Sequence, residues 1–100
     1  MIRDFFLGFI RVHVLYHASV EPVYGAALIE ELSRHGYSLS PGTLYPILLR
    51  MEKEGYLQAQ KRVVSGKARR YYTITDKGTR ALVEAKAKVK EFVLEVLEGG

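Results

Sequence analysis

Five cations gathered in one short segment are the side chains of this sequence best suited to bind a ligand. The segment covers residues 61–75 and contains no acidic residue; its cations are Lys61, Arg62, Lys67, Arg69 and Arg70. Residues 1–60 contain five basic and six acidic side chains, and residues 76–100 contain five of each. The whole positive excess, +4 over 100 residues, therefore comes from one segment. Such a local excess indicates an anionic partner more strongly than the overall charge does.

Residues that carry out catalysis or hold metals do not form a recognisable arrangement. The chain has no cysteine, no paired catalytic carboxylates, no Ser-His-Asp arrangement and no phosphate-binding loop. His13 and His17 are four residues apart on a predicted helix, a spacing that suits a shared metal. Because a metal site needs three or four ligands and no third has matching spacing, we expect these histidines at an interface or a core edge. We therefore predict a binding protein rather than an enzyme, with no metal and no cofactor.

The sequence favours a cytoplasmic protein. The absence of cysteine suits a reducing compartment. The longest apolar run near the N-terminus, Phe5 to Ile10, is too short to span a bilayer, and no small-residue cleavage site of a signal peptide follows it. We expect no membrane partner.

Residues 40–55 are predicted to form a short amphipathic helix. Its core side is expected to comprise Leu44, Ile47, Leu48 and Met51. Ser40 or Thr43 can cap the first amides, and Gly55 suits the left-handed residue that ends a helix. If Ser40 is the cap, Pro46 lies inside the helix and removes a backbone hydrogen bond, at a cost of about 3 kcal/mol. We therefore favour Thr43 as the cap, after a loose first turn whose amides are accessible to a phosphate.

The remaining segments predict three more helices and a β-hairpin. Helices are expected over residues 2–18, 23–34 and 76–98, and strands over residues 56–64 and 69–75. The second and third helices, with the short turn between them, have the proportions of a helix-turn-helix, and the hairpin takes the place of a wing. We predict an α+β fold, mainly α. Residues 1–75 form a winged helix-turn-helix and residues 76–100 a C-terminal dimerisation helix, packed as one compact domain.

Two helices carry more apolar surface than one core can cover, which indicates a homodimer. The N-terminal helix is apolar on two sides, and the C-terminal helix has a heptad seam with apolar residues at spacings of three and four. We expect the dimer interface to comprise Phe5, Phe9, Leu82, Val89, Phe92 and Val96.

Four segments resemble the PadR family of transcriptional regulators. They are Glu21-Pro22-Val23-Tyr24-Gly25, Ser40-Pro41-Gly42-Thr43-Leu44-Tyr45-Pro46, Glu52-Lys53-Glu54-Gly55-Tyr56-Leu57 and Gly66-Lys67-Ala68-Arg69-Arg70-Tyr71-Tyr72-Thr73-Ile74-Thr75-Asp76-Lys77-Gly78. The second and fourth are specific in combination, and the resemblance covers roughly residues 10–82. It implies a dimeric DNA-binding regulator, usually a repressor, with its third helix in the major groove and its wing on the neighbouring backbone or minor groove.

Three features bear on the branch of the family that the chain resembles. Ala26 stands where the family commonly has an aromatic residue, so the second helix is expected to pack differently. The chain ends soon after one terminal helix, which resembles the short, single-domain branch. Some short members bind flat aromatic compounds between subunits with the help of a tryptophan. This sequence has no tryptophan, so the resemblance leaves a small aromatic effector open.

On this interpretation the third helix contacts bases and the wing binds phosphates. The candidates on the helix are Ser40, Gly42, Thr43, Tyr45, Pro46 and Arg50, and those on the wing are Lys67, Arg69, Arg70 and Tyr71. Arg50 suits a guanine edge because its guanidinium can bind in bidentate fashion. Tyr45 has equal grounds as a core residue. A two-fold dimer would bind a palindromic operator with half-sites about 34 Å apart. The alternative function is a winged helix that serves protein assembly and binds no nucleic acid.

Overall fold

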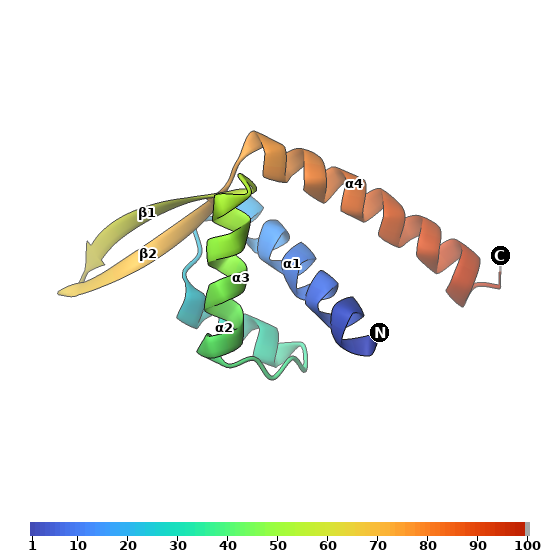
Figure 1. Ribbon diagram of the computed structural model, residues 1–100, viewed down its shortest axis with the longest axis horizontal. Helices are drawn as coiled ribbons and strands as arrows, with labels where there is room; N and C mark the ends of the chain where they lie inside the picture. The colour runs from blue at the N-terminus through green and yellow to red at the C-terminus, as the bar shows by residue number, and fades with distance from the viewer. Residues whose placement is uncertain (100) are drawn as a thin grey trace.

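The computed structural model describes residues 1–99, which form a winged helix-turn-helix with a long C-terminal helix (Figure 1). The elements, in chain order, are α1 (Ile2–Val20), α2 (Gly25–Arg34), α3 (Pro41–Lys53), β1 (Leu57–Val64), β2 (Lys67–Ile74) and α4 (Asp76–Phe92), which continues into the π-helical segment η1 (Val93–Leu97). In Figure 1 the hairpin projects from one side of the helical body and the end of α4 from the other. The molecule is accordingly elongated, with a longest dimension of 53 Å.

The start of α3 differs from the prediction. Ser40 is the N-cap residue, and the amides of Thr43 and Leu44 both donate to its carbonyl oxygen, at 3.1 and 3.0 Å. The first turn is therefore already helical, and the expectation of a loose turn capped by Thr43 is wrong. Pro46 consequently lies inside the helix. The helix tolerates it because Pro46 and Gly42, whose carbonyl loses its helical partner, are both exposed to water.

The end of α3 is fastened to the start of α4 by side-chain hydrogen bonds. Gly55 ends α3 with φ of +89°, as predicted. Thr75 caps α4: its Oγ1 accepts from the amide of Gly78 at 3.0 Å and donates to the carbonyl of Gly55 at 2.6 Å. Lys77 Nζ donates to the carbonyl of Glu54 at 2.6 Å, where a cation also suits the negative end of a helix. These bonds fix the two helices relative to each other.

The hairpin, residues 57–74, is the wing. A tight turn closes its outer end, and a backbone bridge attaches its inner part to the residues before α2. Its strands pair antiparallel, and Ser65 and Gly66 form the turn with φ of 51° and 77°. Two successive residues with positive φ are typical of the tight type I′ hairpin turn. At the other end, the backbones of Val23 and Tyr72 exchange two hydrogen bonds of 2.9 and 2.7 Å. This bridge, which the sequence did not indicate, ties the residues before α2 to the wing.

The core is aliphatic and lies where α1, α2 and α3 meet. Its fully buried large side chains are Ile10, Val14, Leu28, Leu32, Leu44 and Leu48. Leu82, at the start of α4, belongs to this core because only 5% of its surface is exposed in the single chain. The expectation that Leu82 forms part of a dimer interface is therefore wrong, since it has almost no surface left for a partner.

A shallow apolar groove lies between α1 and α4. This α1–α4 groove has a volume of about 380 Å³ and is lined mainly by Phe5, Phe9, Val12, Ala85, Val89 and Phe92. The ring centroids of Phe5 lie 4.8 Å from Phe9 and 6.3 Å from Phe92, so aromatic contacts join the two helices. All three rings remain more than a third exposed. Despite this apolar surface, none of the helices within residues 1–99 combines the length and the apolar character that crossing a lipid bilayer requires.

Candidate nucleic-acid interface

One side of α3 is exposed along its whole length. Of the six residues predicted to contact DNA from this helix, Thr43 is half-buried and the other five are exposed. The exposed five are Ser40, Gly42, Tyr45, Pro46 and Arg50. Arg50 Nε lies 3.5 Å from Glu54 Oε2, and both side chains are largely in solvent. An exposed pair of this kind contributes only about 0–1 kcal/mol, so Arg50 can exchange Glu54 for another acceptor. The side of α3 opposite the core is thus available to a ligand.

Tyr45 combines the two roles that the sequence left open. Its ring lies against Gly25, the first residue of α2, where a Cβ would collide with the ring. The absence of a side chain at Gly25 is therefore what allows Tyr45 to pack there. Yet 45% of Tyr45 remains exposed. The ring holds α2 and α3 together and still presents an edge to the surface.

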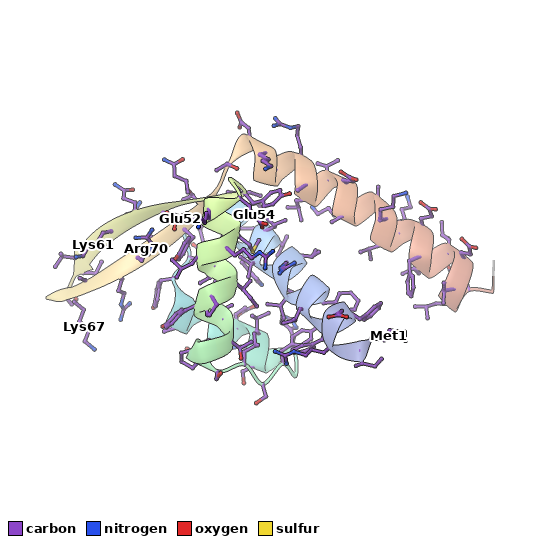
Figure 2. All side chains as sticks on the ribbon, in the orientation of Figure 1. Met1, Glu52, Glu54, Lys61, Lys67 and Arg70 are labelled. Atoms are coloured by element: carbon purple, nitrogen blue, oxygen red, sulfur yellow. The ribbon has the colours of Figure 1, made fainter. Side chains whose placement is uncertain are left out.

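The wing brings like charges directly opposite one another. Lys61 is paired with Arg70 and Arg62 with Arg69 in the register of the strands. Like charges at opposed positions destabilise a hairpin. Of these four cations, Lys61, Arg62 and Arg69 form no ion pair within residues 1–99, whereas Arg70 pairs with a carboxylate of α3. In Figure 2, Lys61 and Lys67 lie towards the outer end of the wing, well away from the helices. The charge arrangement favours a bound anion.

Two tyrosines hold arginines on one face of the wing. The guanidinium carbon of Arg69 lies 4.4 Å from the ring centroid of Tyr24, and that of Arg62 lies 5.1 Å from that of Tyr71. The two rings meet edge to face at 5.3 Å. Each such contact at an exposed site contributes about 0.5–1 kcal/mol, so the cations are oriented before any ligand binds. Tyr24 was not predicted; only the long-range bridge of Val23 with β2 brings it to the wing.

Arg70 differs from the other cations of the wing because it has a carboxylate partner. Its Nη2 lies 2.7 Å from both carboxylate oxygens of Glu52, on the last turn of α3. Figure 2 shows the two side chains meeting where the wing passes α3. The hydrogen bond to Glu52 raises the pKa of Arg70 above its already high value. Sequence reasoning gave Glu52 no role, because the two residues are 18 positions apart on different elements.

The exposed side of α3 and the inner side of the wing meet in one hollow of about 560 Å³. Its lining includes Tyr24, Gly25, Tyr45, Lys67, Arg69 and Arg70. It therefore combines aromatic rings with three cations and contains no carboxylate among its lining residues. An anionic polymer lying along this hollow would contact α3 and the wing together.

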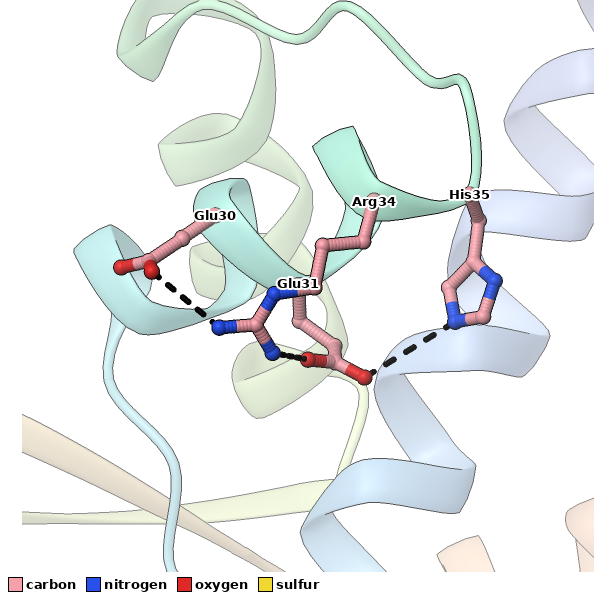
Figure 3. A network of polar contacts seen from close by, with 4 residues as sticks. All are labelled: Glu30, Glu31, Arg34 and His35. Atoms are coloured by element: carbon pink, nitrogen blue, oxygen red, sulfur yellow. Dashed lines mark hydrogen bonds and ion pairs between the residues drawn. The ribbon is translucent and has the colours of Figure 1, made fainter.

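The positive charge of α2, by contrast, is neutralised on its own surface (Figure 3). Arg34 binds Glu31 at 2.6 Å and Glu30 at 3.2 Å. His35 Nε2 lies 3.8 Å from the second oxygen of Glu31. The carboxylates of Glu30 and Glu31 thus balance the charge of Arg34.

The predicted histidine pair is part of a larger aromatic cluster. The ring of His13 stacks on those of His17 and His35, at centroid distances of 6.3 and 5.6 Å, and meets the edge of Tyr37 at 5.3 Å. Burial, followed by the proximity of His35 and His17, lowers the pKa of His13. No three His, Cys, Asp or Glu side chains within the described chain are placed to hold a metal ion. These residues pack α1 against the end of α2.

Comparisons with known proteins identify the family of this chain. Residues 14–84 match the transcriptional regulator PadR-like family. The transcriptional regulator Rv3488 of Mycobacterium tuberculosis is 49% identical over 98 residues, which cover 98% of this chain and 92% of that protein. The PadR family transcriptional regulator of Eggerthella lenta has a TM-score of 0.81 at 34% identity, covering 100% of this chain and 91% of that one. The PadR-like transcriptional regulator of Bacillus cereus has a TM-score of 0.80 at 38% identity, covering 97% and 99%. The chain belongs to the PadR family of transcriptional regulators.

Proposed function

We propose that this regulator binds double-stranded DNA in a sequence-specific manner through α3 and the wing. The observation that carries the proposal is the group of wing cations that form no ion pair within residues 1–99: Arg62 directly opposite Arg69, with Lys61 and Lys67 beside them in the strands. Their repulsion lowers the stability of the free hairpin, and a row of phosphates supplies the missing counter-charge. Protein interfaces are depleted of charged residues at their centre. The charge pattern therefore favours nucleic acid over the alternative of a protein-assembly module.

The two parts of the surface have different tasks in this proposal. The exposed side of α3 enters the major groove, whose width of about 12 Å admits a helix. Its contacts to bases and the adjoining backbone come from Ser40, Gly42, Thr43, Tyr45, Pro46 and Arg50, with Arg50 assigned to a guanine edge. Lys67 and Arg69 bind phosphates, and Tyr71 orients the guanidinium of Arg62 beside them. Phosphate contacts supply affinity and register, whereas base contacts supply specificity.

The binding unit is a homodimer in which a second copy of the chain covers the α1–α4 groove. The groove is apolar, and Val96, four residues beyond Phe92 on the C-terminal segment, is exposed as well. Phe5, Phe9, Val89, Phe92 and Val96 form the proposed interface. Because a two-fold interface uses the same patch on both copies, one groove is enough to generate a closed dimer. Two symmetry-related α3 helices would then occupy half-sites about 34 Å apart on a palindromic operator.

Repression is the regulatory outcome that we propose. A dimer lying across an operator excludes polymerase from that DNA by occupancy, with no need for an activating contact. Release by a small aromatic effector would follow if such a compound bound in the α1–α4 groove. The rings of Phe5, Phe9 and Phe92 offer it stacking partners, and the compound would change the relative placement of the two copies.

Selection of duplexes from a random pool tests the proposal. The purified chain is expected to enrich sequences with a two-fold repeat, and fluorescence anisotropy is expected to show tighter binding to them than to a scrambled duplex. Affinity should fall steeply with salt, because each released counterion contributes to the slope. A chain that enriches no sequence and does not bind mixed duplex DNA at low salt would contradict DNA binding and favour the protein-assembly alternative.

A further inference from the structure

The contact between Glu52 and Arg70 joins the two parts of the proposed DNA-binding surface. Glu52 lies in the last turn of α3 and Arg70 in the middle of β2. Within residues 1–99 it is the only ion pair between α3 and the wing. The inner part of the wing is also fixed to the helical body by the backbone bridge of Val23 with Tyr72 and by the buried side chains of Leu57 and Tyr72. Among these attachments, the pair is the one that joins side chains of α3 and β2 by charge, so it bears directly on the angle at which the wing leaves α3.

The surroundings of Arg70 distinguish it from the cations nearer the tip. Its guanidinium carbon lies 5.8 Å from the ring centroid of Tyr72, which is only 4% exposed and packs in the core. Its Nη2 is occupied by both oxygens of Glu52 at 2.7 Å. The side chain of Lys67, by comparison, extends from the outer end of the wing into solvent (Figure 2). Arg70 is thus placed between a carboxylate and a buried ring, whereas Lys67 has no ion-pair partner in the described chain.

Neutralising Glu52 also matters for a surface that approaches DNA. Its side chain is 29% exposed and lies on the helix that would enter the major groove. An unpaired carboxylate at that position would repel the phosphates that Lys67 and Arg69 are to bind. Arg70 removes this repulsion within the protein itself.

We propose that Arg70 is a positioning residue: its ion pair with Glu52 sets the angle between the wing and α3, and it makes no phosphate contact of its own. The proposal rests on DNA binding as the proposed function. It divides the cations of the wing into two classes. Lys61, Arg62, Lys67 and Arg69 bind phosphate, while Arg70 aligns their contacts with those of α3 so that both fit the same stretch of duplex.

The two classes predict different responses to salt. The logarithm of the binding constant falls with the logarithm of salt concentration by about 0.9 for each phosphate contact. Replacing one phosphate-binding cation in each protomer of a dimer therefore reduces the slope by about 1.8. Arg69→Gln is expected to do so. Arg70→Gln is expected to leave the slope unchanged and to lower the preference for a selected duplex over a scrambled one by roughly tenfold, the scale of coupling between contacting residues.

The experiment is an anisotropy titration of the full chain and its variants against both duplexes at several salt concentrations. Glu52→Gln is expected to lower the preference as much as Arg70→Gln does, because each breaks the same pair. The exchanged pair, Glu52→Arg with Arg70→Glu, is expected to recover most of it. Circular dichroism at the assay temperature confirms that each variant is folded. A recovery by the exchanged pair then indicates the ion pair itself, because exchanging the two charges would not repair a general loss of stability.

The proposal and the function on which it rests fail in different ways. If the unsubstituted chain selects no duplex, DNA binding itself is wrong. If the chain selects a duplex but Arg70→Gln reduces the salt slope as much as Arg69→Gln and leaves the preference intact, Arg70 is a phosphate ligand and the positioning role is overturned. A preference that the exchanged pair does not recover overturns it as well.

Discussion

The junction between α3 and α4 predicts that a single methyl group at Gly78 destabilises the protein. A Cβ at Gly78 would collide with the carbonyl oxygen of Tyr56 and would lie 2.7 Å from Cγ1 of Ile74. The Tyr56 carbonyl is backbone, and it accepts a 3.2 Å hydrogen bond from the amide of Thr75. It cannot move aside as the end of a flexible side chain could. The helix start must therefore shift away from the end of α3.

The expected size of the effect follows from three contributions. Replacing glycine by alanine within a helix stabilises by about 0.5–1 kcal/mol. Forcing extra volume into a packed contact costs about 1–3 kcal/mol. Moving the amide of Gly78 away from Thr75 Oγ1, now at 3.0 Å, weakens a helix cap that is worth about 1 kcal/mol. Gly78→Ala is therefore expected to lower the free energy of unfolding by about 1–3 kcal/mol.

Urea unfolding followed by circular dichroism measures this difference, and Gly8→Ala is the matched control. Gly8 is also helical, but nothing lies within 4 Å of a Cβ placed there. This control is expected to stabilise by about 0.5–1 kcal/mol. Because Gly8 lines the α1–α4 groove, the measurement is made over a series of protein concentrations. A Gly78→Ala variant as stable as the unsubstituted chain would refute the close contact.

Two further perturbations test other parts of the molecule. Phe92→Glu places a charge in the α1–α4 groove and is expected to give a monomer by sedimentation. The control Val83→Glu, at an exposed position outside the lining of that groove, is expected to keep the dimer. A dimeric Phe92→Glu variant would count against the proposed interface. Stability is expected to depend on pH through His13, whose pKa in the folded chain is lowered by burial and by the neighbouring His35 and His17. The unfolded chain binds the proton more readily than the folded chain does. The contribution of neutral His13 to the free energy of unfolding is therefore fully present above pH about 6.5, and it is lost as the pH falls from there through the lower pKa of the folded chain. Urea midpoints at neutral and acidic pH measure this decline, which His13→Gln should reduce; an unchanged decline in that variant would place its origin elsewhere.

Local signals in the sequence were sufficient to predict the helices, the wing and several of their ends. Gly55 was expected to end α3 in a left-handed conformation, and its φ of +89° agrees. Thr75 directly precedes the helix expected over residues 76–98 and is of a type that favours the N-cap position, and its side chain accepts the amide of Gly78. Such features depend on residues a few positions apart, so that their types and spacing predict them directly.

Features that depend on distant residues could not be predicted in the same way. The bridge of Val23 with Tyr72 and the pair of Glu52 with Arg70 form only after the wing has folded back beside α2 and α3. Leu82 fitted a heptad seam by spacing alone, and only the packing of α4 showed that it faces the chain's own core. The predicted cap of α3 was wrong because the prediction counted the full cost of an interior proline, although Pro46 and Gly42 are both exposed to water.

The division of tasks between α3 and the wing is tested most directly by repeating the duplex selection with one variant of each. Arg50→Ala on α3 is expected to relax the selected sequence at one position in each half-site, with a loss of about 1–3 kcal/mol for the original duplex. Lys67→Gln on the wing is expected to select the same sequence as the unsubstituted chain, while binding all duplexes more weakly and with a smaller salt slope. The account would be contradicted if Lys67→Gln changed the selected sequence and Arg50→Ala left it unaltered.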